Sequence, residues 1–273
     1  MKNISLVLIL ILLFTFNTFS NNKKSGNDFT KVRLELSNKV VEPGSQVLLI
    51  YTFIIDKNWH IYWRNPGDSG LPTKIEIEDN DFVVEDYYWL PPLKFQWDEF
   101  TNYGYKDSTK IIVPISIPQN TQYGKYQLKS SVSWLVCKEE CLPGKQNFTT
   151  TIEVGNNSEI NTEINEIILN NYPFKLNNIM SSAKINNDTL FFKIGYNSVN
   201  YGKVYTEFFP LEEGYYVYSG IKCELTTDNA IDIILPLDNF REKDPDEISG
   251  LLVIRNYDNH LPIFSFYVNS KIN

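Results

Sequence analysis

The sequence predicts an all-β protein with two β-sandwich domains in tandem after a signal peptide. Three observations support this fold class. The chain has 273 residues, more than one average domain even without a leader of about 20 residues. Aromatic residues, which favour strands, make up 14% of it. Short apolar runs with strand-like alternation, separated by turn residues, recur along its length.

The first 20 residues have the layout of a secretory signal peptide. Lys2 supplies a positive charge, residues 4–16 are almost all apolar, and the segment ends in the small residue Ser20. The apolar run is shorter than the roughly 20 residues that a membrane-spanning helix needs. We therefore expect cleavage near Ser20 and an exported protein without stable membrane insertion, with an uncleaved anchor as the alternative.

The first sandwich is predicted within residues 28–155. Turn signals such as Pro43-Gly44 separate its strands. The candidate strands are residues 32–36, 47–55, 74–77, 83–90, 110–117, 126–136 and 147–154. Seven or so short strands at this spacing are typical of a β-sandwich.

An acidic, Asn-rich stretch predicts a linker at residues 156–172. A second, smaller β-sandwich is predicted for residues 173–273. Its candidate strands are residues 189–196, 203–209, 215–218, 230–235, 250–256 and 262–268.

The charge balance argues against one class of partner. The formal net charge is -8, from 25 Lys and Arg against 33 Asp and Glu. No basic cluster stands out against this acidic background, so nucleic acid is not expected as a partner.

Cys137 and Cys141 flank three residues at the end of a strand in which alternate residues from Leu128 to Val136 share one face. Such a connection can bring two cysteines to the Cα separation of about 4.4 to 6.8 Å that a disulfide requires. This short bridge would contribute only about 2 kcal/mol, against about 4.6 kcal/mol for a bridge from Cys137 to Cys223. The spacing favours a redox-active bridge, with a structural staple as the alternative. Cys223 is then interpreted as a buried free thiol.

Two other chemistries fit these residues less well. A zinc site would need His60 or His260 to converge with the cysteines from distant segments. A cysteine hydrolase would need His60 as a base, and the neighbouring Glu139 disfavours the attacking thiolate. We predict no metal and no cofactor.

Four motifs follow one another within residues 30–155. They are Asn58 to Thr73 (NWHIYWRNPGDSGLPT), Tyr103-Gly104-Tyr105, the strand ending Val113-Pro114-Ile115, and Ser133 to Gly144 (SWLVCKEECLPG). Together they resemble the N-terminal periplasmic domain of the thiol:disulfide interchange protein DsbD family, in its copper-sensitivity suppressor branch. The aromatic residues Trp59, Tyr62 and Trp63 of the first motif are interpreted as packing residues, and His60 as a half-buried polar residue.

The resemblance implies an immunoglobulin-like domain in the periplasm whose cysteines, here Cys137 and Cys141, cycle between dithiol and disulfide. Such a domain takes electrons from a thioredoxin-like or membrane donor protein and passes them to oxidised periplasmic thiol proteins. By this resemblance both predicted sandwiches are immunoglobulin-like.

In this family a cap loop with an Asp-Glu-Phe-Tyr-Gly run covers the cysteines. The matching positions here are Asp98, Glu99, Phe100 and Tyr103. Phe100 is the candidate cap aromatic, and a carboxylate near the bridge could transfer protons during exchange.

Two hypotheses follow. The first is an exported electron relay of the protein-disulfide reductase type, re-reduced in trans because this chain has neither long apolar spans in its mature part nor a Cys-x-x-Cys motif. The second is a non-catalytic binding or assembly module that uses Cys137–Cys141 as a structural disulfide. The reduction potential of the pair separates the two.

Overall fold

The computed structural model describes residues 24–78, 81–156, 168, 170–176, 179–195, 203–227 and 230–273. In these residues the chain is mostly β, with short helical turns at α1 (Gly26–Phe29) and η1 (Tyr218–Gly220) and helical residues at Ile168, Asn170 and Asn171. The predicted all-β class is confirmed. The predicted signal peptide and most of the predicted linker lie outside the described residues. Among the described helices, none is long and apolar enough to cross a membrane.

Strands from residues 30–154 form two sheets. The five-stranded sheet contains β1 (Thr30–Leu36), β3 (Gln46–Ile55), β10 (Ser108–Ser116), β6 (Val83–Val84) and β7 (Tyr88–Trp89). The seven-stranded sheet contains β2 (Val40–Val41), β12 (Cys141–Val154), β11 (Gly124–Cys137), β4 (His60–Gly67), β9 (Phe100–Lys106), β8 (Leu93–Trp97) and β5 (Lys74–Ile77). The sheets bury their facing side chains against each other, as the period-two alternation predicts.

Strands from residues 174–271 form two four-stranded sheets. One contains β13 (Phe174–Lys175), β20 (Pro262–Lys271), β19 (Glu247–Asn256) and β16 (Val204–Pro210). The other contains β14 (Ser181–Asn186), β15 (Thr189–Gly195), β18 (Ala230–Pro236) and β17 (Lys222–Leu225). We call the two sets of strands the first and the second half of the chain.

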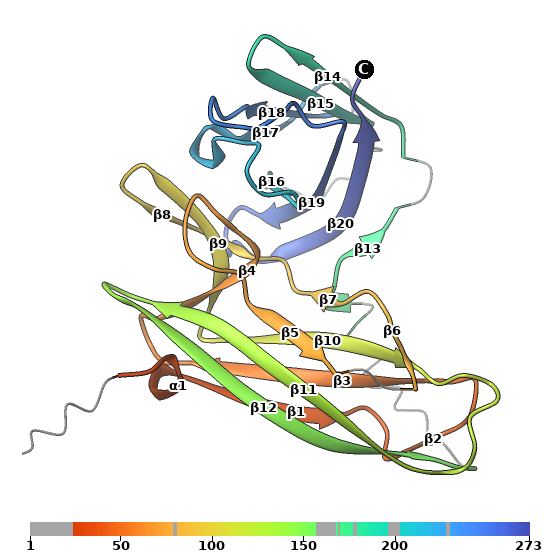
Figure 1. Cartoon of the computed structure of the whole chain (residues 1–273). Coiled ribbons are helices and arrows are strands. Elements are labelled where there is room, and N and C mark those ends of the chain that lie inside the picture. Colours follow the sequence, from red (N-terminus) through yellow and green to blue (C-terminus); the bar gives the residue numbers. More distant parts are fainter. Residues whose placement is uncertain are drawn as a thin grey trace, which may run out of the picture.

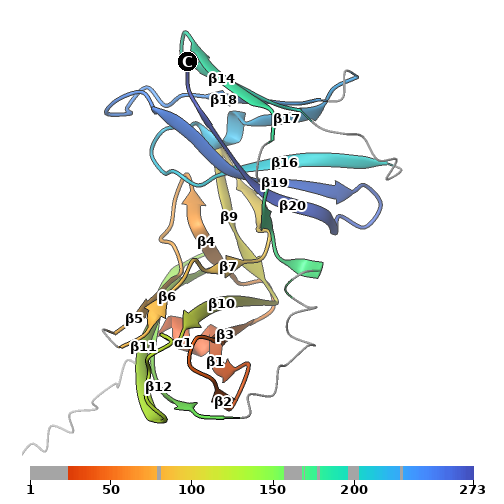
Figure 2. The same ribbon diagram turned by 90° about the vertical axis from the view of Figure 1, so that its right-hand side faces the viewer.

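The second half is stacked on the end of the first half at which β4 and β9 emerge (Figures 1 and 2). Aromatic rings fill the junction. The ring of Phe209 lies 4.9 Å from that of Tyr103 and 6.1 Å from that of Trp63. Buried Arg255 pairs with Glu207 in its own half and donates from Nη2 to the carbonyl of Pro92 in the other half at 2.6 Å. Apolar and polar contacts therefore join the halves into one continuous core.

The longest hairpin positions the cysteines. β11 and β12 pair in unbroken antiparallel register from Gly124 opposite Val154 to Cys137 opposite Cys141. The inward face predicted from Leu128 to Val136 is buried. The register therefore places both cysteines side by side at the tip of a rigid ladder.

Two predicted strands are wrong. Residues 83–90 form two separate two-residue strands rather than one. The reason lies in β10, where the Pro114 carbonyl faces this segment and accepts from the N–H of Glu85. The nitrogen of Pro114 faces the same side but carries no hydrogen, so it interrupts the ladder.

Residues 215–218, the second wrong strand, have only an isolated bridge at Tyr216 and then turn into η1. Gly214, with φ of +81°, bends the chain just before them, and buried Tyr218 turns its side chain toward the first half. Prediction also missed the β8–β9 hairpin and the strands β14 and β17.

A disulfide between a buried and an exposed cysteine

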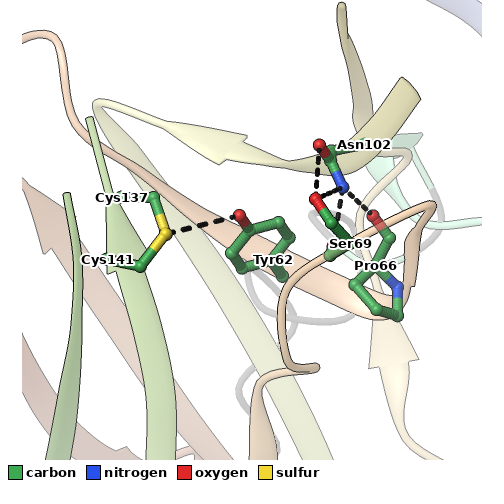
Figure 3. Close-up of a disulfide and its surroundings, with 6 residues drawn as sticks. All are labelled: Tyr62, Pro66, Ser69, Asn102, Cys137 and Cys141. Carbon is green, nitrogen blue, oxygen red and sulfur yellow. Dashed lines mark hydrogen bonds between the residues drawn. A yellow bond between two sulfur atoms is a disulfide. The ribbon is translucent and has the colours of Figure 1, made fainter. Parts of the chain in front are cut away.

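Cys137 and Cys141 form a disulfide across the three-residue turn of the β11–β12 hairpin, with their Cα atoms 4.2 Å apart (Figure 3). The turn residues Lys138, Glu139 and Glu140 are exposed. The bridge that the spacing allowed is therefore formed, at an accessible edge of the molecule.

The two sulfurs differ in access, which the sequence did not indicate. Cys137 is 2% exposed because β11 lies between β12 and β4, and His60 of β4 is its cross-strand neighbour. Cys141 is exposed, since the described pairing of β12 on its other side is confined to Glu153 and Val154. Cys141 is therefore the more accessible cysteine of the pair.

Tyr62 of β4 contacts the disulfide through its hydroxyl group. The hydroxyl donates a hydrogen bond to Cys137 Sγ at 3.3 Å and lies 3.9 Å from Cys141 Sγ. Burial raises the pKa of Tyr62 above its ordinary value of 10, so the hydroxyl keeps its proton at neutral pH. The ring packs as predicted, while the hydroxyl provides a permanent donor to the buried sulfur.

The last residues of β4 and the turn after them hold the ring of Tyr62, and we call residues 65–70 the loop that covers Tyr62. Gly70 has φ of +95°, and a Cβ atom built there would lie 2.3 Å from Cζ of Tyr62. Only glycine lets the backbone approach the ring so closely in this conformation. Thr73 Oγ1 donates to the Tyr62 carbonyl at 2.7 Å. The Asn-Pro-Gly-Asp-Ser-Gly motif thus forms the cover of the tyrosine.

His60 contacts aromatic rings next to Cys137. Its ring stacks on Phe95 at 4.7 Å and meets the edge of Tyr62 at 5.3 Å. Burial lowers the pKa of His60 below 6.5, so the imidazole is neutral at pH 7. In this state it supplies no positive charge to stabilise a thiolate.

Comparison with known protein families gives a match over the half of the chain that carries the disulfide. Residues 28–153 match the family described as thiol:disulfide interchange protein DsbD, N-terminal. The first half of the chain belongs to this family. DsbD N-terminal domains relay electrons through a cysteine pair, and this chain carries such a pair as a disulfide. A search of curated protein sequences finds no match.

Solved structures of similar fold include the N-terminal periplasmic domain of ScsB from Proteus mirabilis. It has a TM-score of 0.66 at 14% identity, with 92% of this chain and 96% of that chain covered. The likeness therefore extends over both halves and concerns the fold. Another match is the major pilin subunit BcpA of Bacillus cereus, with a TM-score of 0.31 at 9% identity, covering 89% of this chain and 66% of that chain.

The cap residues suggested by the DsbD resemblance lie on the β8–β9 hairpin. Asp98 and Glu99 form its exposed turn, and Phe100, at the start of β9, is 52% exposed opposite Trp97. Their described contacts do not include the disulfide. Tyr103 is fully buried and packs against Phe209 of the second half, so burial raises its pKa well above 10. In this structure the Tyr62 hydroxyl lies next to both sulfurs, and Gly70 packs on the Tyr62 ring.

The N-terminal segment braces the strand that carries Cys141. The side-chain amide of Asn27 donates to the carbonyl of Lys145 at 2.8 Å and accepts from its N–H at 3.0 Å. Gly26 fits tightly against the backbone of residues 142–144. Lys24 forms an exposed ion pair with Glu140 at 3.3 Å, an interaction of small energetic weight. These contacts satisfy part of the free edge of β12 near Cys141.

Other candidates from the sequence lie apart from the disulfide. Cys223 is a half-buried free thiol on β17, and burial raises its pKa to about 12. His260 forms a hydrogen bond with the hydroxyl of Tyr205 in the second half. In the described part of the chain, His, Cys, Asp and Glu side chains form no group of three or more that could hold a metal ion.

Proposed function

We propose that the chain is an exported electron relay that uses the Cys137–Cys141 pair. It accepts electrons from a thioredoxin-like or membrane donor protein and passes them to oxidised periplasmic thiol proteins. The observation that carries the proposal is the asymmetry of the disulfide, in which an exposed sulfur is joined to a buried sulfur that already receives a hydrogen bond. Membership of the first half in the DsbD N-terminal family supports it.

The reducing half-reaction begins at Cys141. A thiolate of the donor attacks Cys141 Sγ, the bond to Cys137 breaks, and Cys137 leaves as a thiolate that takes up a proton. The second thiol of the donor then attacks its own sulfur in the mixed disulfide and releases Cys141. The donor ends as a disulfide, and the chain gains two electrons and two protons. The Tyr62 hydroxyl stabilises the leaving Cys137 thiolate by donating a hydrogen bond to it. This lowers the pKa of the leaving thiol, and a thiol of lower pKa leaves faster.

The dithiol transfers electrons onward by the reverse chemistry. The Cys141 thiolate attacks a disulfide of the oxidised protein, and Cys137 then attacks Cys141 in the mixed disulfide. The substrate leaves as a dithiol and the Cys137–Cys141 bridge re-forms. Because Cys137 lies opposite Cys141 in an intact ladder, it needs little movement for this second step.

The domain division is part of the proposal. The two halves correspond to two immunoglobulin-like sandwiches, residues 28–155 and 173–273.

The cap is also part of the proposal. Asp98, Glu99 and Phe100 act as a cap if their hairpin bends toward the disulfide. A Phe100→Ala chain that glutathione reduces several-fold faster than the wild type would support the cap, and an unchanged rate would contradict it. Proton transfer by Tyr103 would be supported if Tyr103→Phe altered the pH dependence of that rate and contradicted if it did not.

The reduction potential tests the relay. The mature chain is equilibrated in graded glutathione buffers, alkylated, and analysed by mass. We expect a potential in the range of exchange proteins, roughly -120 to -270 mV. A value below about -300 mV would make the pair a structural staple and favour the binding or assembly module.

A mixed-disulfide trap tests the order of attack. In Cys137→Ser, Cys141 is first converted to a mixed disulfide with glutathione. A thioredoxin-like protein whose own second cysteine is replaced by serine should then displace the glutathione and accumulate as a stable adduct, since neither partner keeps a thiol that resolves it. In the matched Cys141→Ser variant, the remaining thiol is buried and should give little adduct. Equal trapping by both variants would contradict the assigned roles.

A further inference from the structure

Asn65 connects the second half of the chain to the loop that covers Tyr62. The Asn65 side chain is fully buried at the junction of the halves. Its amide nitrogen lies 2.9 Å from the carbonyl oxygen of Pro210, 3.1 Å from that of Glu212 and 3.3 Å from the hydroxyl of Tyr218. The nitrogen of one buried amide of the first half therefore has three acceptors in the second half.

Hydrogen bonds also fix the start of the same loop. The Oδ1 atom of Asn65 accepts from the N–H of Gly67 at 2.9 Å. The carboxylate of Asp68 accepts from the backbone N–H of Thr101 at 2.6 Å and from that of Tyr218 in the second half. The start of the loop is thus held jointly by β9 and by the second half.

The loop continues to the tyrosine. Asn102 of β9 donates to the carbonyls of Pro66 and Ser69 at 3.1 and 2.6 Å (Figure 3). The next residue, Gly70, lies against the ring of Tyr62, whose hydroxyl reaches the disulfide. Figure 3 shows Tyr62 between the loop and the bridge. Displacement of the loop would remove the support on the face of the ring away from the sulfurs.

We propose that the second half positions the redox site: through Asn65 it fixes the loop of residues 65–70 and so keeps the Tyr62 hydroxyl on Cys137. Asn65 is a positioning residue, since it touches neither sulfur. This inference rests on the proposed relay function, and it gives the second half a role in the exchange reaction. It also accounts for an amide buried among the aromatic rings of the junction, where an unpaired amide would be costly.

A double-mutant cycle tests the inference. The rate at which glutathione reduces the disulfide is measured on the full mature chain for the wild type, Asn65→Ala, Tyr62→Phe and the double variant. We expect Asn65→Ala to slow reduction about threefold and Tyr62→Phe about fivefold, with the double variant no slower than Tyr62→Phe alone. This non-additivity is expected only if Asn65 acts through the tyrosine hydroxyl. Multiplicative effects of the two substitutions would overturn the proposal.

Two further variants separate positioning from stability. Phe209→Leu opens a small cavity at the same junction but leaves the Asn65 hydrogen bonds in place, and its reduction rate should stay at the wild-type value even though its melting temperature falls. Tyr218→Phe removes one Asn65 partner and keeps the ring, so it should slow reduction less than Asn65→Ala. It serves as the test if Asn65→Ala fails to fold.

The outcomes distinguish the two levels of proposal. If the wild-type disulfide does not exchange with glutathione at all, the relay function fails. If the wild type exchanges and both Asn65→Ala and Tyr218→Phe keep its rate, the relay stands and the positioning role is wrong. A rate loss in Phe209→Leu equal to that in Asn65→Ala would also overturn the positioning role, because general loosening would then explain both.

Discussion

Removal of the Tyr62 hydroxyl should slow reduction of the disulfide without unfolding the protein. In Tyr62→Phe the ring still fills the space beneath Gly70, and only the donor to Cys137 Sγ is lost. A hydrogen bond to a charged acceptor contributes about 2 kcal/mol. If roughly half of the thiolate charge has developed in the transition state, the barrier rises by about 1 kcal/mol, which is about a fivefold slower reaction.

The assay follows the rate of reduction by glutathione on the oxidised mature chain, with acid quenching, alkylation and mass analysis. Because Tyr62 keeps its proton at neutral pH, the ratio of wild-type to variant rates should be constant between about pH 6 and pH 8. Tyr105→Phe is the matched control, since its hydroxyl is also buried but donates to the Leu90 carbonyl at 2.6 Å rather than to sulfur. A wild-type rate in Tyr62→Phe, or an equal loss in Tyr105→Phe, would refute the reasoning.

Three other substitutions have defined outcomes. Gly70→Ala places a methyl group against the Tyr62 ring at a positive φ and should lower the free energy of unfolding in urea by at least about 1 to 3 kcal/mol. An unchanged urea midpoint would show that the loop moves aside without cost. Asn27→Ala loses both hydrogen bonds to Lys145 and should lower the free energy of unfolding by about 1 kcal/mol. An unchanged free energy of unfolding would mean that water replaces these two hydrogen bonds. His60 has a lowered pKa in the fold, so the unfolded chain binds a proton more readily and wild-type stability should fall as pH drops below about 6.5. His60→Gln should lack that part of the pH dependence, and identical pH profiles for the two chains would contradict the assignment.

The sequence was sufficient for the features that depend on local pattern. The alternation from Leu128 to Val136 places a strand with one buried face, and its end places Cys137 at a turn. The three-residue spacing then allows the bridge to Cys141. In each case the deciding information lies within a few neighbouring positions, because strand period and disulfide reach are both short-range properties.

Features that depend on distant segments could not be obtained in this way. The difference in access between Cys137 and Cys141 arises because β4, about 75 residues earlier in the chain, pairs beside Cys137 and not beside Cys141. Tyr62 was interpreted as a packing residue, which its ring is, and no local pattern distinguishes a tyrosine whose hydroxyl also reaches sulfur. The same limit applies to Asn65, whose amide nitrogen makes its contacts with residues about 145 to 153 positions away.

The proposed relay requires the bridge to open and close without loss of the fold. A loop of this length contributes only about 2 kcal/mol in the chain-entropy description, so its reduction removes little stability. The β11–β12 ladder keeps Cys137 opposite Cys141 through backbone hydrogen bonds that do not depend on the sulfurs, and Asn27 satisfies the edge of β12 near this end. On the other side, Gly70 of the loop packs on the Tyr62 ring, whose hydroxyl donates to Cys137 Sγ. The parts that hold the cysteines together are thus separate from the bond that is made and broken, which is the arrangement that a repeated exchange reaction requires.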